Sequence, residues 1–170
     1  MGSGVKLSVF ERYLRGSVQH FNQEKYWKRR FQVVNPSSRL PRLLKYYYLY
    51  YIKRCDAFNN ASLGTHIGYG AEFASRPSMP HGLYGIIVSH NAKIGKNCTI
   101  YHQTTIGEGT YGAPRIGDNV VVGAGAKLFG KIRIGDNAQI GGGAVVTFDV
   151  PDNCVVKAAK GTVCYPKDSE

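Results

Sequence analysis

Residues 116–146 read IGDNVVVGAGAKLFGKIRIGDNAQIGGGAVV, and this stretch repeats one pattern every six residues. An aliphatic residue opens each repeat, a small or β-branched residue usually stands four positions later, and glycine often follows the aliphatic residue directly. The same period extends back to residue 88. The aliphatic positions are Val88, Ile94, Ile100, Ile106, Ile116, Val122, Leu128, Ile134, Ile140 and Val146.

A period of six fits neither an α-helix, which repeats at 3.6 residues, nor a lone strand, which repeats at 2. It fits a parallel β-helix in which three hexapeptides form the three sides of a coil of about 18 residues. The aliphatic and small residues then point into the interior, and stacking buries a face that one repeat alone leaves exposed. We therefore predict a mainly β protein, a left-handed parallel β-helix, with earlier repeats at Ala61, Ile67 and Phe73.

Residues 1–60 follow a different pattern. Apolar and aromatic residues fall three and four positions apart, which is helical spacing, and residues 35–38 (Asn-Pro-Ser-Ser) break it. A second helix is expected from about Pro41 to about Asp56. We predict a helical N-terminal segment over residues 1–60, a β-helix domain over 61–156 and a C-terminal tail over 157–170.

The positive charge of the chain is concentrated at its N-terminal end. The net charge is +11, and residues 1–60 hold 12 of the 22 Lys and Arg residues against three acidic residues. Basic runs such as Lys28–Arg30 accompany the tyrosine cluster Tyr46–Tyr48. This composition suits peripheral contact with an anionic membrane surface or an acidic glycan. The alternative is a solvated face on a helix that caps the main domain. We expect no nucleic-acid partner.

The remaining bulk features point to a cytoplasmic protein. No apolar stretch reaches the length of a membrane span, and the start of the chain lacks the pattern of a signal peptide. The four cysteines, Cys55, Cys98, Cys154 and Cys164, are too far apart for the paired spacing of a zinc site. We expect buried thiols and no metal.

The six-residue period breaks twice. About three extra residues enter near residues 79–81, and Ile106 and Ile116 are ten residues apart instead of six. The second break predicts a four-residue insertion that projects as a loop within residues 107–115. Repeats form the scaffold, whereas irregular segments more often carry function.

Two histidines lie next to these breaks. If the faces that begin at residues 82 and 100 stack, His81 and His102 lie on neighbouring coils, and we expect the glycine-rich loop to converge with them. A neutral imidazole can take the proton of a hydroxyl nucleophile near physiological pH, as acyl transfer to an alcohol requires. We predict His81 as general base, His102 as a second catalytic candidate, and the backbone N–H of Gly107 as an oxyanion donor. The other histidines, His20, His66 and His90, are expected to be structural or exposed.

Three segments resemble the serine O-acetyltransferase family: residues 79–88 (MPHGLYGIIV), 100–107 (IYHQTTIG) and 123–127 (GAGAK). The resemblance covers about residues 61–160. It implies acetyl-CoA as co-substrate, a homotrimer, and the general-base role for His81. It also implies that Ala124, Gly125, Gly141 and Gly142 line the pantetheine arm and that Lys160 or Arg115 lies near the phosphates.

Two departures from the family pattern bear on the acceptor. Pro80 stands where the family has an aspartate before the general base, and Ala113 stands where it has a second histidine. We therefore expect the acceptor to be a hydroxyl of a sugar or of a lipid-linked glycan precursor, as in capsule and exopolysaccharide acetyltransferases. The alternative is serine O-acetylation in cysteine biosynthesis. The partner of His81 stays open between Asp56, Glu72 and a backbone carbonyl.

Two other classes of protein use similar repeats. Carbonic anhydrases of the γ type bind zinc through three histidines, two of them five residues apart, and that spacing does not occur here. A scaffold without catalytic activity is the other alternative. A metal assay and an acetyl-CoA turnover test distinguish the three.

Overall fold

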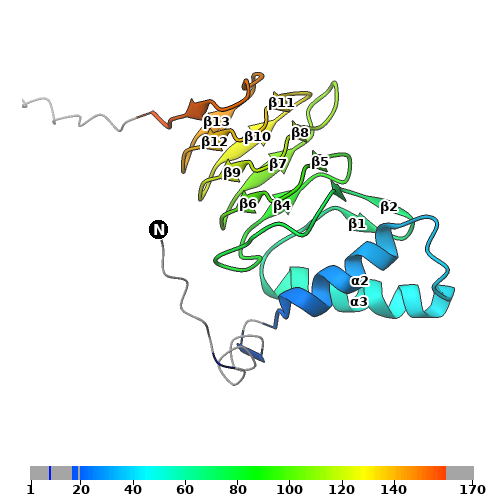
Figure 1. Cartoon of the computed structure of the whole chain (residues 1–170). Helices are drawn as coiled ribbons and strands as arrows, with labels where there is room; N and C mark the ends of the chain where they lie inside the picture. The colour runs from blue at the N-terminus through cyan, green and yellow to red at the C-terminus, as the bar shows by residue number, and fades with distance from the viewer. Residues whose placement is uncertain (1–7, 9–16, 19, 160–170) are drawn as a thin grey trace, which may run out of the picture.

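The computed structural model describes residues 8, 17–18 and 20–159 of the chain. Two helices lie at the N-terminal end of a stack of triangular coils (Figure 1). The stack is a left-handed parallel β-helix of about five turns, as the six-residue period predicts. In the described part of the chain, neither helix has the length and apolar character needed to cross a membrane.

Three parallel sheets form the sides of the β-helix, and each strand contributes only two or three residues. The first sheet contains β4 (Ile87–Val88), β7 (Thr105–Gly107), β10 (Lys127–Phe129) and β13 (Val145–Val146). The second contains β3 (Glu72–Phe73), β5 (Lys93–Ile94), β8 (Arg115–Ile116) and β11 (Arg133–Ile134). The third contains β6 (Thr99–Ile100), β9 (Val121–Val122), β12 (Gln139–Ile140) and β14 (Val155–Val156).

The core is the column of side chains that the repeat places inside the coils. All ten aliphatic positions of the repeat are at most 5% exposed. The small residues four positions later fill the remaining interior, for example Ala126 and Ala138, which are fully buried. Because each coil leaves its aliphatic face open to the next, the stack buries these side chains only as a whole.

The pairing of the strands confirms that the chain contains extra residues in both coils where the six-residue period breaks. Phe73 pairs with Ile94, and Ile94 pairs with Ile116. Both of these coils are longer than a regular coil, such as the one from Ile116 to Ile134. The predicted stacking of residue 82 on residue 100 is wrong, because Ser78 pairs with Thr99 and the extra residues follow within the turn at residues 80–85.

Two further irregularities escaped the sequence analysis. Thr65–His66 (β1) and Tyr69–Gly70 (β2) form an antiparallel hairpin, so Ile67 lies in its turn and does not begin a regular repeat. In the last coil, Ile134 pairs with Val150, so this coil is shorter than a regular one.

The cysteines differ in part from the prediction of buried thiols. Cys55 and Cys98 are buried as expected, but Cys154 is exposed, and Cys164 lies outside the described residues.

One corner of the β-helix is held by ladders of polar side chains. Asn97, Asn119, Asn137 and Asn153 all adopt positive φ angles and pass amide hydrogen bonds from coil to coil. Beside them, Asp118 Oδ1 accepts from Lys96 N at 2.6 Å, and Asp136 Oδ1 accepts from Asp118 N at 2.7 Å. Asparagine tolerates the left-handed backbone conformation that this tight corner requires.

The N-terminal helices are α2 (Gln23–Val34) and α3 (Arg42–Phe58), which agrees with the predicted helix after Pro41. The Asn22 side chain caps α2 by accepting from Lys25 N. Arg30 of α2 is 1% exposed and donates to the carbonyls of Leu63 and Ala71, both at 2.8 Å. This buried guanidinium ties α2 to the first coil of the β-helix.

Candidate active site at one corner of the β-helix

His81 and His102 come together at the corner between the third and first sheets. Their ring centroids are 4.9 Å apart and the ring planes stand at 84°. His81 is exposed and also contacts the ring of Tyr101 at 5.9 Å. The contact follows from the local register, because the extra residues after Met79 bring the His81 turn under the corner that holds His102.

His102 carries a polar atom without a partner. Its Nδ1 is buried, and it neither donates a hydrogen bond to the residues that the structure describes nor accepts one from them. Such atoms are rare in folded proteins and often mark a site where a ligand or water completes the bonding. The backbone of the same corner is held by hydrogen bonds: Gln103 N donates to Tyr84 O at 2.9 Å, and Gly125 N donates to His102 O at 3.0 Å.

Small residues continue this corner above the histidines. Ala124 and Gly125 lie one coil above His102, and Gly143 N donates to Ala124 O at 2.8 Å from the coil above that. A methyl group on Gly142 would approach Ala124 O to 3.2 Å. The predicted cofactor residues Ala124, Gly125, Gly141 and Gly142 therefore form a narrow track of accessible backbone, here called the glycine track, that leads away from the histidine pair.

The glycine-rich loop lies at a different corner of the same chain. It leaves β7 at Gly107 and is closed by a bridge between Gly109 and Gly112, with Tyr111 86% exposed at its tip. Glu108 anchors it by accepting from Asn91 Nδ2 at 2.9 Å and from Ser89 Oγ at 3.1 Å, and these hydrogen bonds lower the pKa of Glu108. Within one chain, the length of β7 separates the loop from His102, so the predicted convergence of loop and histidines does not occur.

The other predicted site residues are distributed as follows. Gly107 lies against the ring of Phe129, which occupies the space that a side chain at residue 107 would fill. Arg115 is exposed on the second sheet, in register with Lys93 and Arg133, and is remote from the glycine track. Lys160 lies outside the described residues.

Neither carboxylate considered as a partner of His81 contacts it. Glu72 pairs with Lys93 Nζ at 2.9 Å, and Asp56 of α3 accepts from the hydroxyl of Tyr26 in α2 at 2.7 Å. Burial raises the pKa of Asp56 to about 6, although the hydrogen bond from Tyr26 and the positive charges of Lys53 and Arg30 act in the opposite direction. In the described structure, the ring contacts of His81 are with Tyr101 and His102, whereas the family pattern has an aspartate before this histidine.

Tyr101 and Gln103 are contacts that the sequence analysis missed. Gln103 adopts a φ of 57° and lies against Gly85, where a side chain on residue 85 would meet it. The sequence signal that could have identified Gln103 is its polar side chain directly after His102, at the corner where the turn of His81 also lies. Among the described residues, no group of three His, Cys, Asp or Glu side chains is placed to hold a metal ion.

Comparisons with known proteins agree with this architecture. Residues 113–147 match the bacterial transferase hexapeptide family, described as six repeats. The chain is 38% identical over 110 residues to the serine acetyltransferase of Mycobacterium tuberculosis, which covers 62% of this chain and 48% of that protein. The chain spans about half the length of the curated relatives that it matches.

Two solved structures superpose on the chain. One is serine acetyltransferase isoform 3 of Entamoeba histolytica in complex with cysteine, with a TM-score of 0.60, 27% identity, and coverage of 72% of this chain and 44% of that one. The other is the serine acetyltransferase of Neisseria gonorrhoeae in complex with serine, with a TM-score of 0.54, 28% identity, and coverage of 92% and 56%.

These comparisons confirm the resemblance to the serine O-acetyltransferase family and correct the predicted acceptor. The prediction of a sugar or glycan hydroxyl is wrong, because the matching relatives are serine acetyltransferases and one solved relative holds serine. The prediction gave too much weight to Pro80 and Ala113. Two substituted side chains do not determine an acceptor when other polar groups, such as the unpartnered Nδ1 of His102, lie at the same corner.

Proposed function

We propose that this chain, whose β-helix is homologous to that of the serine acetyltransferases, transfers the acetyl group of acetyl-CoA to the hydroxyl of serine. The observation that carries the proposal is the perpendicular His81–His102 pair at the lower end of the glycine track. An exposed imidazole beside a track of accessible backbone suits a reaction between a small hydroxyl compound and an extended thioester.

His81 acts as the general base in this proposal. Its imidazole takes the hydroxyl proton of serine as the hydroxyl oxygen attacks the thioester carbonyl, which gives a tetrahedral intermediate. The carbon–sulfur bond then breaks, and the imidazolium returns its proton to the sulfur of coenzyme A. Both substrates must be bound together, since the acetyl group passes directly from sulfur to oxygen.

His102 is the positioning residue for His81. Its ring plane stands across that of His81, so the contact limits rotation of the catalytic imidazole where the family pattern would use an aspartate. The Nδ1 of His102 lacks a partner but is buried, so it reaches a polar group of the amino-acid acceptor only when the ring turns.

The glycine track supports binding of the pantetheine arm. Small residues at Ala124, Gly125, Gly141 and Gly142 leave backbone groups within reach of an extended ligand, which a larger side chain would cover. Arg115 and Lys160 are assigned to acetyl-CoA only through the family resemblance, whereas Gly107 is assigned as an oxyanion donor because its backbone N–H belongs to the glycine-rich loop. Arg115 lies on the second sheet and not at the corner of the track, so in the proposed trimer it would serve the cofactor of a neighbouring subunit.

The positions of the two irregular segments support a homotrimer. The histidine pair lies at the corner before strand β7 of the first sheet, and the loop at residues 107–115 lies at the corner after this strand. In the proposed assembly, three copies pack with parallel axes around a closed cyclic axis, and the loop of one subunit lies beside the histidines of the next. In this arrangement each site takes its base from one chain and its cover from another.

The test measures release of the coenzyme A thiol from acetyl-CoA with L-serine as acceptor. His81→Ala is expected to lower kcat by about 10² to 10⁴-fold, the usual contribution of a general base. The matched control is His20→Ala, because His20 is also exposed but lies beside α3, stacked on the ring of Phe58 at 4.0 Å. Full activity of His81→Ala, or no turnover of serine by the wild type, would refute the proposal.

A further inference from the structure

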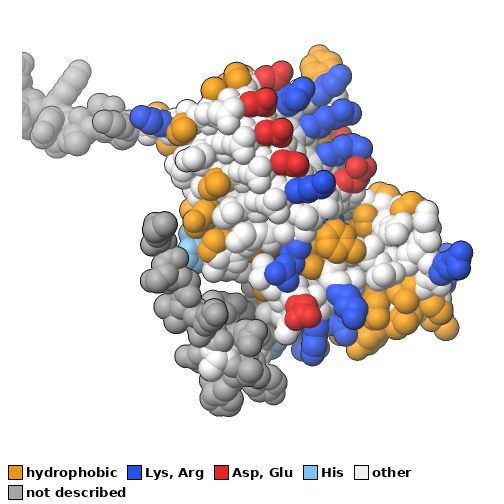
Figure 2. Space-filling view, in the orientation of Figure 1, with side chains coloured by type: hydrophobic (Ala, Val, Ile, Leu, Met, Phe, Trp, Pro, Cys, Tyr) orange, Lys and Arg blue, Asp and Glu red, His pale blue; other side chains and the backbone are white. Residues whose placement is uncertain are grey.

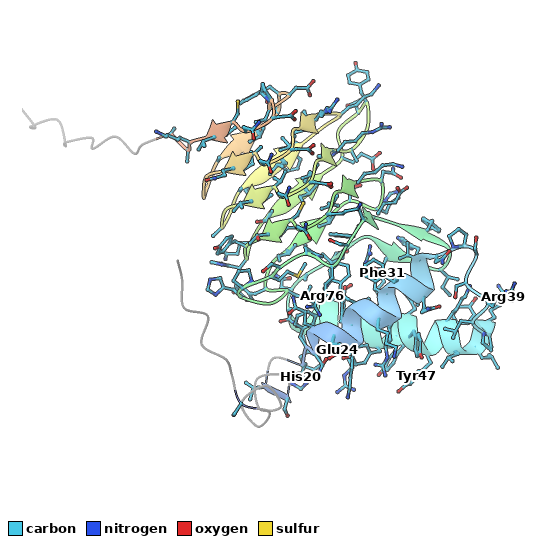
Figure 3. The ribbon with its side chains drawn as sticks, in the orientation of Figure 1. His20, Glu24, Phe31, Arg39, Tyr47 and Arg76 are labelled. Carbon is cyan, nitrogen blue, oxygen red and sulfur yellow. The ribbon has the colours of Figure 1, made fainter. Side chains whose placement is uncertain are left out.

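The outward face of α3 is apolar, and none of the described residues covers it. Its buried face contains Ile52 and Cys55, which pack on the rest of the chain. The opposite face exposes large side chains at helical spacing: Leu43 is 84% exposed, Tyr47 57% and Tyr50 64%. Tyr47 projects from the side of α3 that faces away from the β-helix (Figure 3). Hydrophobic side chains gather over this part of the molecule (Figure 2).

Cations surround this apolar face, and acidic side chains are scarce. Among residues 20–58, Glu24 is the one exposed carboxylate, since Asp56 is 4% exposed. Eight Lys and Arg residues are at least partly accessible there: Lys25, Lys28, Arg29, Arg39, Arg42, Lys45, Lys53 and Arg54. Several guanidinium groups lie over the aromatic rings, for example Arg42 over Tyr46 at 5.8 Å and Arg54 over Phe58 at 5.7 Å.

A basic cavity of about 450 Å³ opens between the two helices at the edge of this face. Its lining includes Lys25, Arg29 and Arg54 and contains no carboxylate among the described residues. The Arg29 guanidinium lies over the ring of Tyr51 at 4.0 Å, and both residues line the cavity, so the ring holds this charge at the cavity wall. Cations and hydroxyl groups without a competing acid are the partners that a phosphate group prefers.

We infer that the outer face of α2 and α3 docks on the surface of an anionic phospholipid bilayer. Tyrosine and leucine side chains suit the boundary between headgroups and acyl chains, and flanking cations suit anionic headgroups. The cavity between the helices receives one lipid phosphate. The helix lies on the surface, since neither described helix can cross a membrane.

The charge of the face argues against a second copy of the chain as its occupant. A self-complementary contact would place the same cations on both sides, and like charges brought together in an interface are costly. An anionic bilayer neutralises these charges, so binding should weaken as the salt concentration rises.

The experiment uses the full chain and vesicle sedimentation. One set of vesicles contains phosphatidylcholine alone, and the other contains phosphatidylcholine with about a third phosphatidylglycerol. We expect the chain to sediment with the anionic vesicles at low salt, to be released at high salt, and to stay in solution with neutral vesicles. Equal recovery with both kinds of vesicle, or no binding to either, overturns the inference.

Variants locate the contact. Lys25→Gln, Lys28→Gln and Arg54→Gln together should weaken binding by about a hundredfold, since each cation near an anionic surface contributes about fivefold. The matched control, Lys96→Gln, Lys131→Gln and Arg133→Gln, removes the same charge from the exposed surface of the β-helix and should bind nearly as the wild type does. Equal weakening by both sets would show a non-specific charge effect and overturn the inference.

Apolar substitutions test insertion separately from charge. Leu43→Ser with Tyr50→Ser should weaken vesicle binding by at least about tenfold, since it removes two large exposed apolar groups. The control Phe148→Ser removes a side chain of similar exposure, 55%, from the last coil and should have no effect. The particle mass is measured for every variant without vesicles. A lower mass for Leu43→Ser with Tyr50→Ser would identify the face as a contact between chains and overturn the inference.

Discussion

The rings of His81 and His102 lie on neighbouring coils, perpendicular to each other and 4.9 Å apart, although the two residues are distant in the chain. Neither ring has a carboxylate partner among the described interactions. The orientation of the proposed base therefore depends on aromatic packing, which makes the contribution of His102 open to direct measurement.

A pair of substitutions at His102 separates packing from hydrogen bonding. An aromatic pair contributes about 1 kcal/mol, so His102→Ala should lower kcat about fivefold if its ring only positions His81. His102→Phe keeps a ring and should recover most of that loss. If His102→Phe instead raises KM for serine strongly while kcat is kept, the imidazole nitrogen binds the acceptor. Steady-state kinetics with both substrates varied provide the measurement.

The loop at residues 107–115 offers a test of the shared site. Removal of residues 109–112 deletes the insertion and restores the regular coil length, so the variant should fold with nearly unchanged thermal stability and lose activity. Mixed assemblies of this variant with His81→Ala should regain about a quarter of the wild-type sites if each site combines two chains. A mixture that stays inactive after denaturation and joint refolding would show that each chain acts alone.

Gly107 and Phe129 should be energetically coupled. A methyl group at residue 107 meets the Phe129 ring, so Gly107→Ala should lower the free energy of unfolding by about 1 kcal/mol as the half-exposed ring moves aside. In a Phe129→Ala background the same substitution should cost little. A double-mutant cycle by urea denaturation measures the coupling, and equal costs in both backgrounds would contradict the assigned contact.

The stability of the chain should fall as the pH rises from about 4 to about 6. Burial raises the pKa of Asp56 from 3.8 to about 6, so the folded state holds a proton that the unfolded state releases in this range. The loss amounts to about 3 kcal/mol when complete and persists above pH 6. Asp56→Asn should remove this decline, because the amide oxygen still accepts from Tyr26 without a charge. The control Glu24→Gln, at an exposed carboxylate, should keep the decline of the wild type. Denaturant unfolding at a series of pH values tests both.

The asparagine corner provides a prediction about the scaffold. Asn137 has a φ of 58° and exchanges amide hydrogen bonds with Asn119 and Asn153, each at 3.1 Å. Asn137→Ala should lower the free energy of unfolding by about 2 kcal/mol, because alanine is strained in this conformation. Asn137→Gly should cost about half as much, since glycine accepts the backbone angle and loses only the amide contacts. Equal losses would mean that the hydrogen bonds, and not the backbone, determine the cost.

The side of the β-helix wall on which each repeat residue lies can be predicted from the amino-acid sequence alone. The six-residue period predicted the burial of Val88, Ile106, Leu128 and Val146, because in a stacked coil the interior position depends only on the local repeat. It also predicted the length of the two insertions and the place of the second, since an added residue shifts every later aliphatic position. The first insertion was placed too early, because Ser78 already pairs with Thr99 and the extra residues follow in the turn at residues 80–85. These properties are local, so they can be counted along the chain.

The corner that each segment occupies is instead a property of the tertiary fold. The hairpin at residues 65–70 and the shortened last coil change the strand register without a change in the aliphatic pattern that the sequence analysis used. The loop and His102 lie at opposite ends of β7, although Gly107 follows His102 closely in the sequence. A corner turns the chain into another sheet, so nearness in sequence does not become nearness in space. The contact between His81 and His102 shows the opposite situation, in which two residues far apart in the sequence lie close together in space. It exists because each coil returns the chain to the same corner one layer higher, and that return depends on the packing of every coil below it.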